Sequence, residues 1–281
     1  MLTLLVSLLP ASELITSIVG ILLIVLVGIP HGATDHVLFN VMKGQSIEEK
    51  PQRAFLGQYL LVIAAYGVMW WILPSLALLL FLAVSAYHFG EAQLRYLSPS
   101  WMMRAASFLW GGLVLMIILF VHLPEVKPLL VPFLIQESVW FFIEQNAVVI
   151  SGVTALLLIA TLVLCSGQAV MKELPELLIL AVITWNSPLL LSFAIFFVFW
   201  HSVDAVKSQI SKIRLSEGSF DLRRWIKLST PFTALSLVGI GGTIAYGLYF
   251  GTSLPLLTVF FVLIALITLP HAIVMSRFYR F

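Results

Sequence analysis

Nine long apolar segments, separated by short polar stretches, dominate this chain of 281 residues. A helix that crosses the hydrocarbon core of a bilayer needs about 20 mostly apolar residues, and most of the segments approach that length. They are predicted at about 14–30, 54–73, 75–95, 104–122, 147–165, 173–185, 189–206, 231–250 and 255–275. The pattern predicts an all-α, polytopic transmembrane helical bundle of eight or nine spans, with residues 1–281 forming one membrane-embedded domain.

The chain carries too few charged side chains to cover a surface that faces water. Charged residues make up 10% of the sequence and the mean hydropathy is +1.08, whereas a soluble domain carries roughly 25% charged residues. No basic stripe with interleaved aromatic residues is present, so nucleic acid is not an expected partner. The first 20 residues lack the basic start and cleavage site of a signal peptide, and we interpret them as the entry into a retained first span.

The number of crossings depends on one short segment. Residues 173–185 are too few to cross comfortably, and Pro188 should interrupt the helix before 189–206. Short cytoplasmic loops collect Lys and Arg, and nine crossings with the N-terminus outside place nearly all basic residues on the cytoplasmic side. This arrangement makes 207–230 a polar cytoplasmic loop and 123–146 an interfacial segment at the outer face.

Five of the six histidines fall at one depth on this topology. Near the cytoplasmic face lie His31, His36, His88, His201 and His271, and at the outer face lies His122. Ionisable groups within a membrane usually face the bundle interior or a cavity, and imidazole is a common ligand for iron, copper and zinc. A hydrogen bond between helices explains any single histidine equally well. Four helices that each deliver one histidine to the same layer favour a shared metal ion.

An acid follows three of these histidines at helical spacing. The pairs are His31 with Asp35, His88 with Glu91, and His201 with Asp204. Separations of three or four residues place acid and imidazole on one face of a helix, where a carboxylate can orient a metal-bound histidine or bind the metal itself. Acids at the ends of spans also simply meet water. No acid follows His271 at this spacing, where the chain has only Val274 and Met275.

Aromatic residues flank the histidines. Tyr87, Phe89 and Trp200 are candidates for the wall of an apolar tunnel that takes a long, flat substrate from the bilayer. Phe196 and Phe197 are adjacent, so they cannot both face one cavity, and we interpret them as packing or lipid-facing residues.

Four motifs occur in order along nearly the whole chain. They are Gly28-Ile-Pro-His31-Gly-Ala-Thr-Asp35-His36, Ala86-Tyr-His88-Phe-Gly-Glu91, Phe199-Trp-His201-Ser202 and Thr268-Leu-Pro-His271. Together they resemble the Brp/Blh family of membrane carotene dioxygenases. The resemblance implies an Fe²⁺ enzyme that cleaves β-carotene with O₂ at its central 15,15' double bond and yields two molecules of retinal. It also implies a bacterial inner or plasma membrane location and a functional link to a rhodopsin.

The resemblance carries over residue by residue, with one departure. His31, His88 and His201 match the iron-ligand histidines of the family. Other members have a fourth ligand histidine four residues after the one in the Trp-His-Ser motif, and this chain has Ala205 there. We expect His271 to replace it, since it lies at the same depth. The alternatives are His36, Asp204 or an iron held by three histidines alone.

Three other functions compete with this interpretation. Membrane di-iron desaturases and hydroxylases need several closely spaced histidine clusters, which this chain lacks. A proton-coupled transporter could use the His–acid pairs as a relay, but the outer halves of the spans are almost free of charged residues. A carotenoid- or retinal-binding protein without catalysis is the third alternative, and Ala205 is the residue that favours it.

Overall fold

The computed structural model describes residues 13–50, 52–133, 136–250 and 256–281, and within them it contains helices and no strand. The predicted all-α class is therefore confirmed for this part of the chain. The predicted entry into the first span begins in residues 1–12, outside the described residues. The α-helices are α2 (Glu13–Leu23), α3 (Ile29–Gly32), α4 (Asp35–Met42), α5 (Arg53–Ile72), α6 (Pro74–Leu94), α7 (Trp101–Val121), α8 (Leu123–Leu130), α9 (Glu137–Cys165), α10 (Gly167–Trp185), α11 (Leu189–Ile195), α12 (Val203–Glu217), α13 (Leu222–Phe250) and α14 (Leu256–Arg280). Two π-helices, η1 (Ile24–Gly28) and η3 (Phe196–Ser202), and one 3-10 turn, η2 (Val131–Phe133), complete the set.

The chain divides into two compact units. The first contains Leu78–His201 and the described residues up to Leu23, and the second contains Ile24–Ala77 and Ser202–Phe281. The chain passes between the units after Leu23, Ala77 and His201, each time within a helical stretch. The single domain expected from the sequence stays a prediction.

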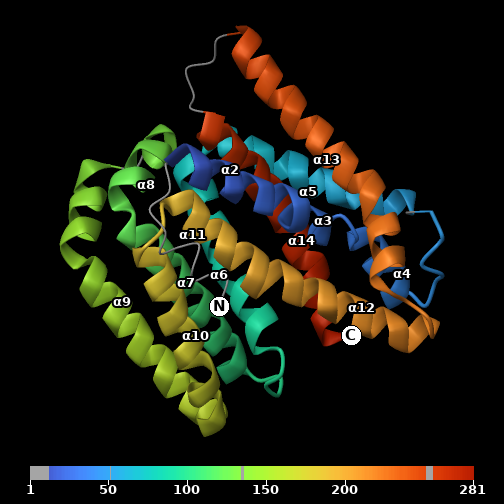
Figure 1. Ribbon diagram of the computed structural model, residues 1–281, viewed down its shortest axis with the longest axis horizontal. Helices are drawn as coiled ribbons and strands as arrows, with labels where there is room; N and C mark the ends of the chain where they lie inside the picture. Colours follow the sequence, from blue (N-terminus) through green and yellow to red (C-terminus); the bar gives the residue numbers. More distant parts are fainter. Residues whose placement is uncertain (1–12, 51, 134–135, 251–255) are drawn as a thin grey trace. The chain divides into compact units, whose positions relative to one another are not determined.

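In the first unit, α7 packs along α9 and α10, and α2 packs against α11 (Figure 1). Helix α7 begins after Ser100, whose hydroxyl oxygen accepts a hydrogen bond from the Met103 backbone N–H at 3.0 Å and caps the first turn. The largest side chains of its core include Trp110, Leu158 and Phe196. These apolar interfaces provide the rigid frame that carries α6.

Helices α6 and α7 approach unusually closely because each presents a glycine to the other. A Cβ atom built on Gly90 would lie 1.8 Å from the Ser107 carbonyl oxygen, and one on Gly111 would lie 1.9 Å from the Ala86 carbonyl oxygen. Both distances are far below van der Waals contact, so any side chain at these positions would push the backbones apart. Gly90 and Gly111 therefore permit the close approach of these two helices.

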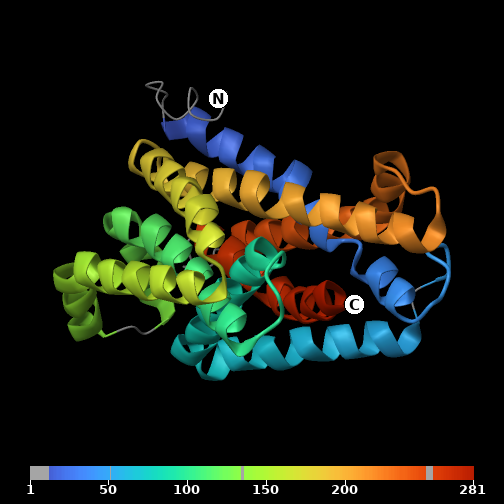
Figure 2. The ribbon, with the colours of Figure 1, turned by 90° about the horizontal axis from the view of Figure 1, so that it is seen from below.

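In the second unit, α14 packs against α4, α5 and α13, and α13 also packs against the short helix α3 (Figure 2). Its core includes Leu38, Ile47, Ala205, Ile213 and Phe278. This packing surrounds the single turn of α3, which is too short to hold its position by its own hydrogen bonds.

Within the described residues, eight helices are long and apolar enough to cross a membrane, which indicates a multi-pass membrane protein. Helix α10 is not among them. It is longer than the predicted 173–185, but Lys172, Glu173 and Glu176 lie in its first half. The predicted break at Pro188 is confirmed, since α10 ends at Trp185 and α11 begins after that proline.

Two predicted loops are wrong in part. Residues 137–146, predicted to lie between spans, are the first residues of the long helix α9. Residues 207–230 are mostly helical, because α12 runs to Glu217 and α13 begins at Leu222. Polar sequence does not exclude a helix: α12 is amphipathic and continues out of the apolar span.

Candidate functional site

The second unit buries one pair of histidines. His31 lies in α3, directly after the π-helix η1, and His271 lies in α14 after Pro270. Their ring centroids are 4.8 Å apart with the ring planes at 88°, and the residues are 4% and 5% exposed. Gly32 lies beside this contact, and a Cβ there would meet His271 Nδ1 at 3.4 Å, an ordinary van der Waals distance. Two histidines 240 positions apart in sequence therefore meet edge to face in a buried layer.

Asp35 pairs with His271 and not, as its spacing predicted, with His31. The Asp35 Oδ1 atom lies 2.9 Å from His271 Nδ1, and both side chains are buried. The predicted pair fails because α3 ends at Gly32 and a turn precedes Asp35, the first residue of α4, so the two residues do not share one continuous helix. His271 has no acid at helical spacing in its own helix. Its partner comes from another helix.

Tyr59 is a site residue that sequence analysis missed. Its hydroxyl, on α5, donates a hydrogen bond to Asp35 Oδ2 at 2.9 Å, while the other carboxylate oxygen faces His271. Three helices thus supply a Tyr59–Asp35–His271 chain that holds the carboxylate and orients the imidazole. The only available signal was a tyrosine hydroxyl in an apolar span, which needs a partner when buried.

The hydrogen bonds of this pair determine which ring nitrogen can bind a metal. His31 Nδ1 contacts the Gly28 carbonyl oxygen, and His271 Nδ1 contacts the Asp35 carboxylate. Both oxygens act as acceptors, so Nδ1 carries the hydrogen in each ring. The Ser202 hydroxyl lies 3.4 Å from His31 Nδ1 on the same side of the ring. In the neutral form of each histidine, the lone pair suited to a metal is then on Nε2.

The first unit buries a second pair, His88 and His201. His88 lies in α6 and His201 in the π-helix η3, with ring centroids 4.7 Å apart at 73°. They are 2% and 3% exposed. A π-helix widens the turn and changes which side chains share a face, and such turns recur at functional sites. Phe197, four residues before His201, stacks on its ring at 5.7 Å and 17°.

Two phenylalanines border this pair. The Phe89 ring lies 4.8 Å from the His201 ring and 5.1 Å from the Phe196 ring, and both phenylalanines are buried. Phe196 also contacts Trp110 in the core. Phe89 therefore contacts His201 on one side and belongs to the apolar core of the first unit.

The other predicted tunnel residues occupy different surroundings. The Tyr87 hydroxyl donates to Glu91 Oε1 at 3.0 Å, one turn along α6. Trp200 is half-buried and packs against the cluster of Ile183, Leu191 and Ile195. Their role as tunnel walls stays a prediction.

Each pair has the spacing expected of two imidazoles on one metal ion. A metal–nitrogen bond of about 2.1 Å puts a ring centroid about 3.2 Å from the metal, so two adjacent ligands have centroids about 4.5–5.3 Å apart. The measured 4.8 Å and 4.7 Å fall in this range. His31, His201 and His271 are all buried and each offers a nitrogen that could hold a metal. Imidazole donors suit iron, copper and zinc.

Comparison with known proteins gives the family. Residues 22–279 match the family described as "Beta-carotene 15,15'-dioxygenase", which spans all four histidines of the two pairs. The chain belongs to the β-carotene 15,15'-dioxygenase family. A protein named "Beta-carotene 15,15'-dioxygenase" from uncultured marine bacterium 66A03 is 27% identical to this chain over an alignment of 279 residues. The alignment covers 92% of this chain and 92% of that protein. No solved structure matches.

In this member of the β-carotene dioxygenase family, residue 205 cannot supply a histidine ligand. Ala205 is 1% exposed and belongs to the apolar core of the second unit. Asp204 beside it is half-buried. The position that the resemblance assigns to a ligand histidine is therefore filled by a small packing residue.

The two remaining histidines of this dioxygenase-family chain have other surroundings. The His36 ring lies 4.5 Å from the Phe232 ring. His122 contacts the carbonyl oxygens of Ile118 and Ser187, each at 2.7 Å, and so ties the end of α7 to the break before α11. The geometry supports a structural role for His122.

Proposed function

We propose that this chain is an Fe²⁺-dependent dioxygenase that cleaves β-carotene, or a related carotenoid, at the central 15,15' double bond. O₂ is the second substrate, and two molecules of retinal are the products. The family match over residues 22–279 carries the proposal. The two buried imidazole pairs support it, because a buried, acid-oriented histidine is typical of a metal ligand.

The proposed iron ligands are His31, His88, His201 and His271. His271 replaces the imidazole lost at Ala205, and the Asp35 carboxylate at 2.9 Å supports this assignment because it orients the ring as a ligand requires. Glu91 and Asp204 act around the other pair, by orienting groups or as alternative ligands. His36 is the alternative among the histidines.

The four histidines form one proposed ligand set because their sequence motifs share a predicted depth and a family resemblance. The proposal therefore predicts one iron per chain.

When bound, Fe²⁺ supplies the redox chemistry that activates O₂. The protein residues would hold the iron and orient its histidine ligands. Asp35 and Tyr59 fix the imidazole of His271, while Phe89 and Phe197 exclude water around His201. Tyr87, Phe89 and Trp200 are the proposed walls that hold the polyene with its central bond in place, so the position of cleavage follows from the position of binding.

We also propose a cell inner or plasma membrane location, with the histidine layer toward the cytoplasmic side. In the nine-crossing topology predicted from the sequence, which counts residues 173–185 as a crossing, the excess of Lys and Arg in the cytoplasmic segments supports this orientation. A carotenoid dissolves in the bilayer, so substrate and enzyme share the lipid phase. Retinal released there is available to a membrane rhodopsin as its chromophore.

Expression of the chain in cells that make β-carotene tests the function. We expect loss of the orange colour and accumulation of retinal, measured by chromatography of extracts. The purified protein should contain one iron per chain, and His31→Ala and His201→Ala should each abolish both iron and retinal.

The outcomes separate the alternatives. Retained colour with folded protein that copurifies with carotenoid would support the binding protein without catalysis, which Ala205 favours. Two irons per chain would refute the shared site, and unchanged iron content in both alanine variants would refute the ligand assignment. His122→Ala is the matched control, since it removes a buried histidine far along the sequence from every proposed ligand and should keep iron bound.

A further inference from the structure

Gln209 is a fully buried amide at the centre of the second unit's hydrogen-bond network. It lies on α12 and is 0% exposed. Its Oε1 atom accepts from the Thr34 hydroxyl at 3.0 Å and from Trp225 Nε1 at 2.8 Å. Its Nε2 atom donates to the His31 carbonyl oxygen at 3.1 Å and approaches Met275 Sδ at 3.6 Å. Four contacts use the whole hydrogen-bonding capacity of the amide.

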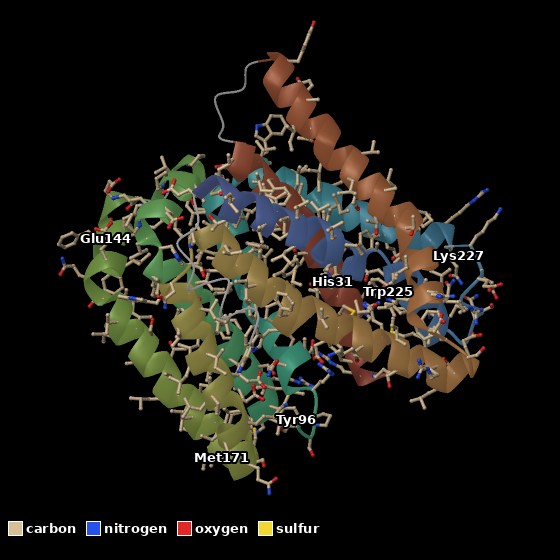
Figure 3. The ribbon with its side chains drawn as sticks, in the orientation of Figure 1. His31, Tyr96, Glu144, Met171, Trp225 and Lys227 are labelled. Carbon is tan, nitrogen blue, oxygen red and sulfur yellow. The ribbon has the colours of Figure 1, made fainter. Side chains whose placement is uncertain are left out.

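The partners determine the orientation of this amide without ambiguity. An indole N–H can only donate, so Trp225 must face Oε1, and a carbonyl can only accept, so His31 must face Nε2. Figure 3 shows Trp225 and His31, whose elements flank α12. A rotated amide would lose both bonds, and a buried polar group without its partner is costly.

The network joins the two elements that carry the histidine pair of this unit. Helix α3 has a single turn and ends at Gly32, and Gln209 holds the carbonyl of His31 within that turn. Met275 lies one turn after His271 on α14, so the same amide also touches the helix of the second histidine. Gln209 therefore sets the position of the His31 backbone relative to the helix that carries His271.

We propose that Gln209 is a positioning residue for the metal ligands His31 and His271, an inference that rests on the proposed function. It contacts no ligand nitrogen. Its effect passes through the His31 backbone, which aims the imidazole at the metal. Sequence spacing gives no sign of this role, because Gln209 lies 178 positions from His31.

Two changes at Gln209 and one at its partner separate positioning from simple stability. Gln209→Met keeps the length of the side chain and removes every strong hydrogen bond. Gln209→Glu keeps acceptors for Thr34 and Trp225 but removes the donor to His31. Trp225→Phe removes a bond on the acceptor side and leaves the donor bond to His31. Gln45→Met is the matched control, since Gln45 is a half-buried amide in the same unit that bonds Gln52.

Purified proteins in detergent are titrated with Co²⁺, whose visible spectrum reports ligand number and geometry, and their unfolding temperatures are measured without metal. We expect Gln209→Met and Gln209→Glu to weaken Co²⁺ binding about tenfold or more and to alter the spectrum. Trp225→Phe should lower the unfolding temperature and keep the spectrum of the unchanged chain.

Each outcome decides one proposal. Co²⁺ binding and a spectrum unchanged in both Gln209 variants would overturn the positioning role and leave the proposed function standing. Equal loss of binding in Trp225→Phe and Gln209→Met would also overturn it, because the effect would then follow general stability. Absence of Co²⁺ binding by the unchanged chain would refute the metal site itself.

Discussion

Replacement of Asp35 by Asn tests whether the Tyr59–Asp35–His271 chain prepares a metal ligand. Asp35 is 4% exposed and accepts two hydrogen bonds of 2.9 Å, one on each carboxylate oxygen. The amide keeps one acceptor for His271, but its nitrogen replaces the oxygen that faces Tyr59, so the tyrosine hydroxyl must turn to accept. The variant therefore keeps the shape of the hydrogen-bonded Tyr59–Asp35–His271 chain and removes the negative charge of Asp35.

The expected loss follows from those contacts. Removal of a carboxylate that orients a metal-bound histidine typically costs about 10–100-fold in metal affinity, which is about 1.4–2.7 kcal/mol at 1.36 kcal/mol per factor of ten. Asp35→Asn retains a hydrogen bond to His271 and should lie near tenfold. Asp35→Ala removes both hydrogen bonds and should lie near 100-fold.

Competition between the purified protein and a chelator of known affinity measures the loss for Fe²⁺. Glu217→Gln is the control, because it removes one negative charge from an exposed position of the same unit and should bind iron like the unchanged chain. Unfolding without metal is measured alongside. The reasoning is refuted if both Asp35 variants bind iron within twofold of the unchanged chain while remaining folded.

Three further predictions concern the frame around the site. Tyr59→Phe removes one hydrogen bond to the same carboxylate and should weaken iron binding severalfold, less than Asp35→Ala, in the same competition assay. Gly111→Ala places a Cβ 1.9 Å from the Ala86 carbonyl oxygen and should destabilise the protein by about 1–3 kcal/mol or more. Gly112→Ala meets nothing within 4 Å and should be neutral or slightly stabilising in the same thermal unfolding experiment; equal effects would contradict the close packing of α6 and α7. Burial is the largest of the effects on the Glu173 carboxyl and raises its pKa above the ordinary 4.5. The folded protein therefore binds the carboxyl proton more tightly than the unfolded chain does. Stability should therefore fall as pH rises from 4.5 through the raised pKa, and Glu173→Gln should flatten that fall in unfolding measurements from pH 4 to 8.

The class of the fold and the position of most spans could be read from local sequence. Length and hydropathy decide whether a segment crosses a bilayer, and both are properties of consecutive residues. The errors fell where local polarity was taken for irregular structure. Residues 207–217, predicted as part of a loop, are helical because they belong to α12, whose buried face includes Ala205, Gln209 and Ile213 and packs in the second unit.

The sequence alone determined which histidines matter, since His31, His88, His201 and His271 lie in recognisable motifs and share a predicted depth. It could not determine how they pair. His31 meets His271, and His88 meets His201, because helix rotation and packing bring distant segments together.

The acid of His271 shows most clearly what only tertiary structure decided. Spacing assigned Asp35 to His31, on the assumption of one continuous helix, but the chain turns after Gly32 and carries the carboxylate to another partner. The contacts of Tyr59 and Gln209 are equally absent from any local pattern. A helix period predicts neighbours within one helix, whereas the groups that orient these histidines come from other helices, whose relative rotation depends on the whole packed unit.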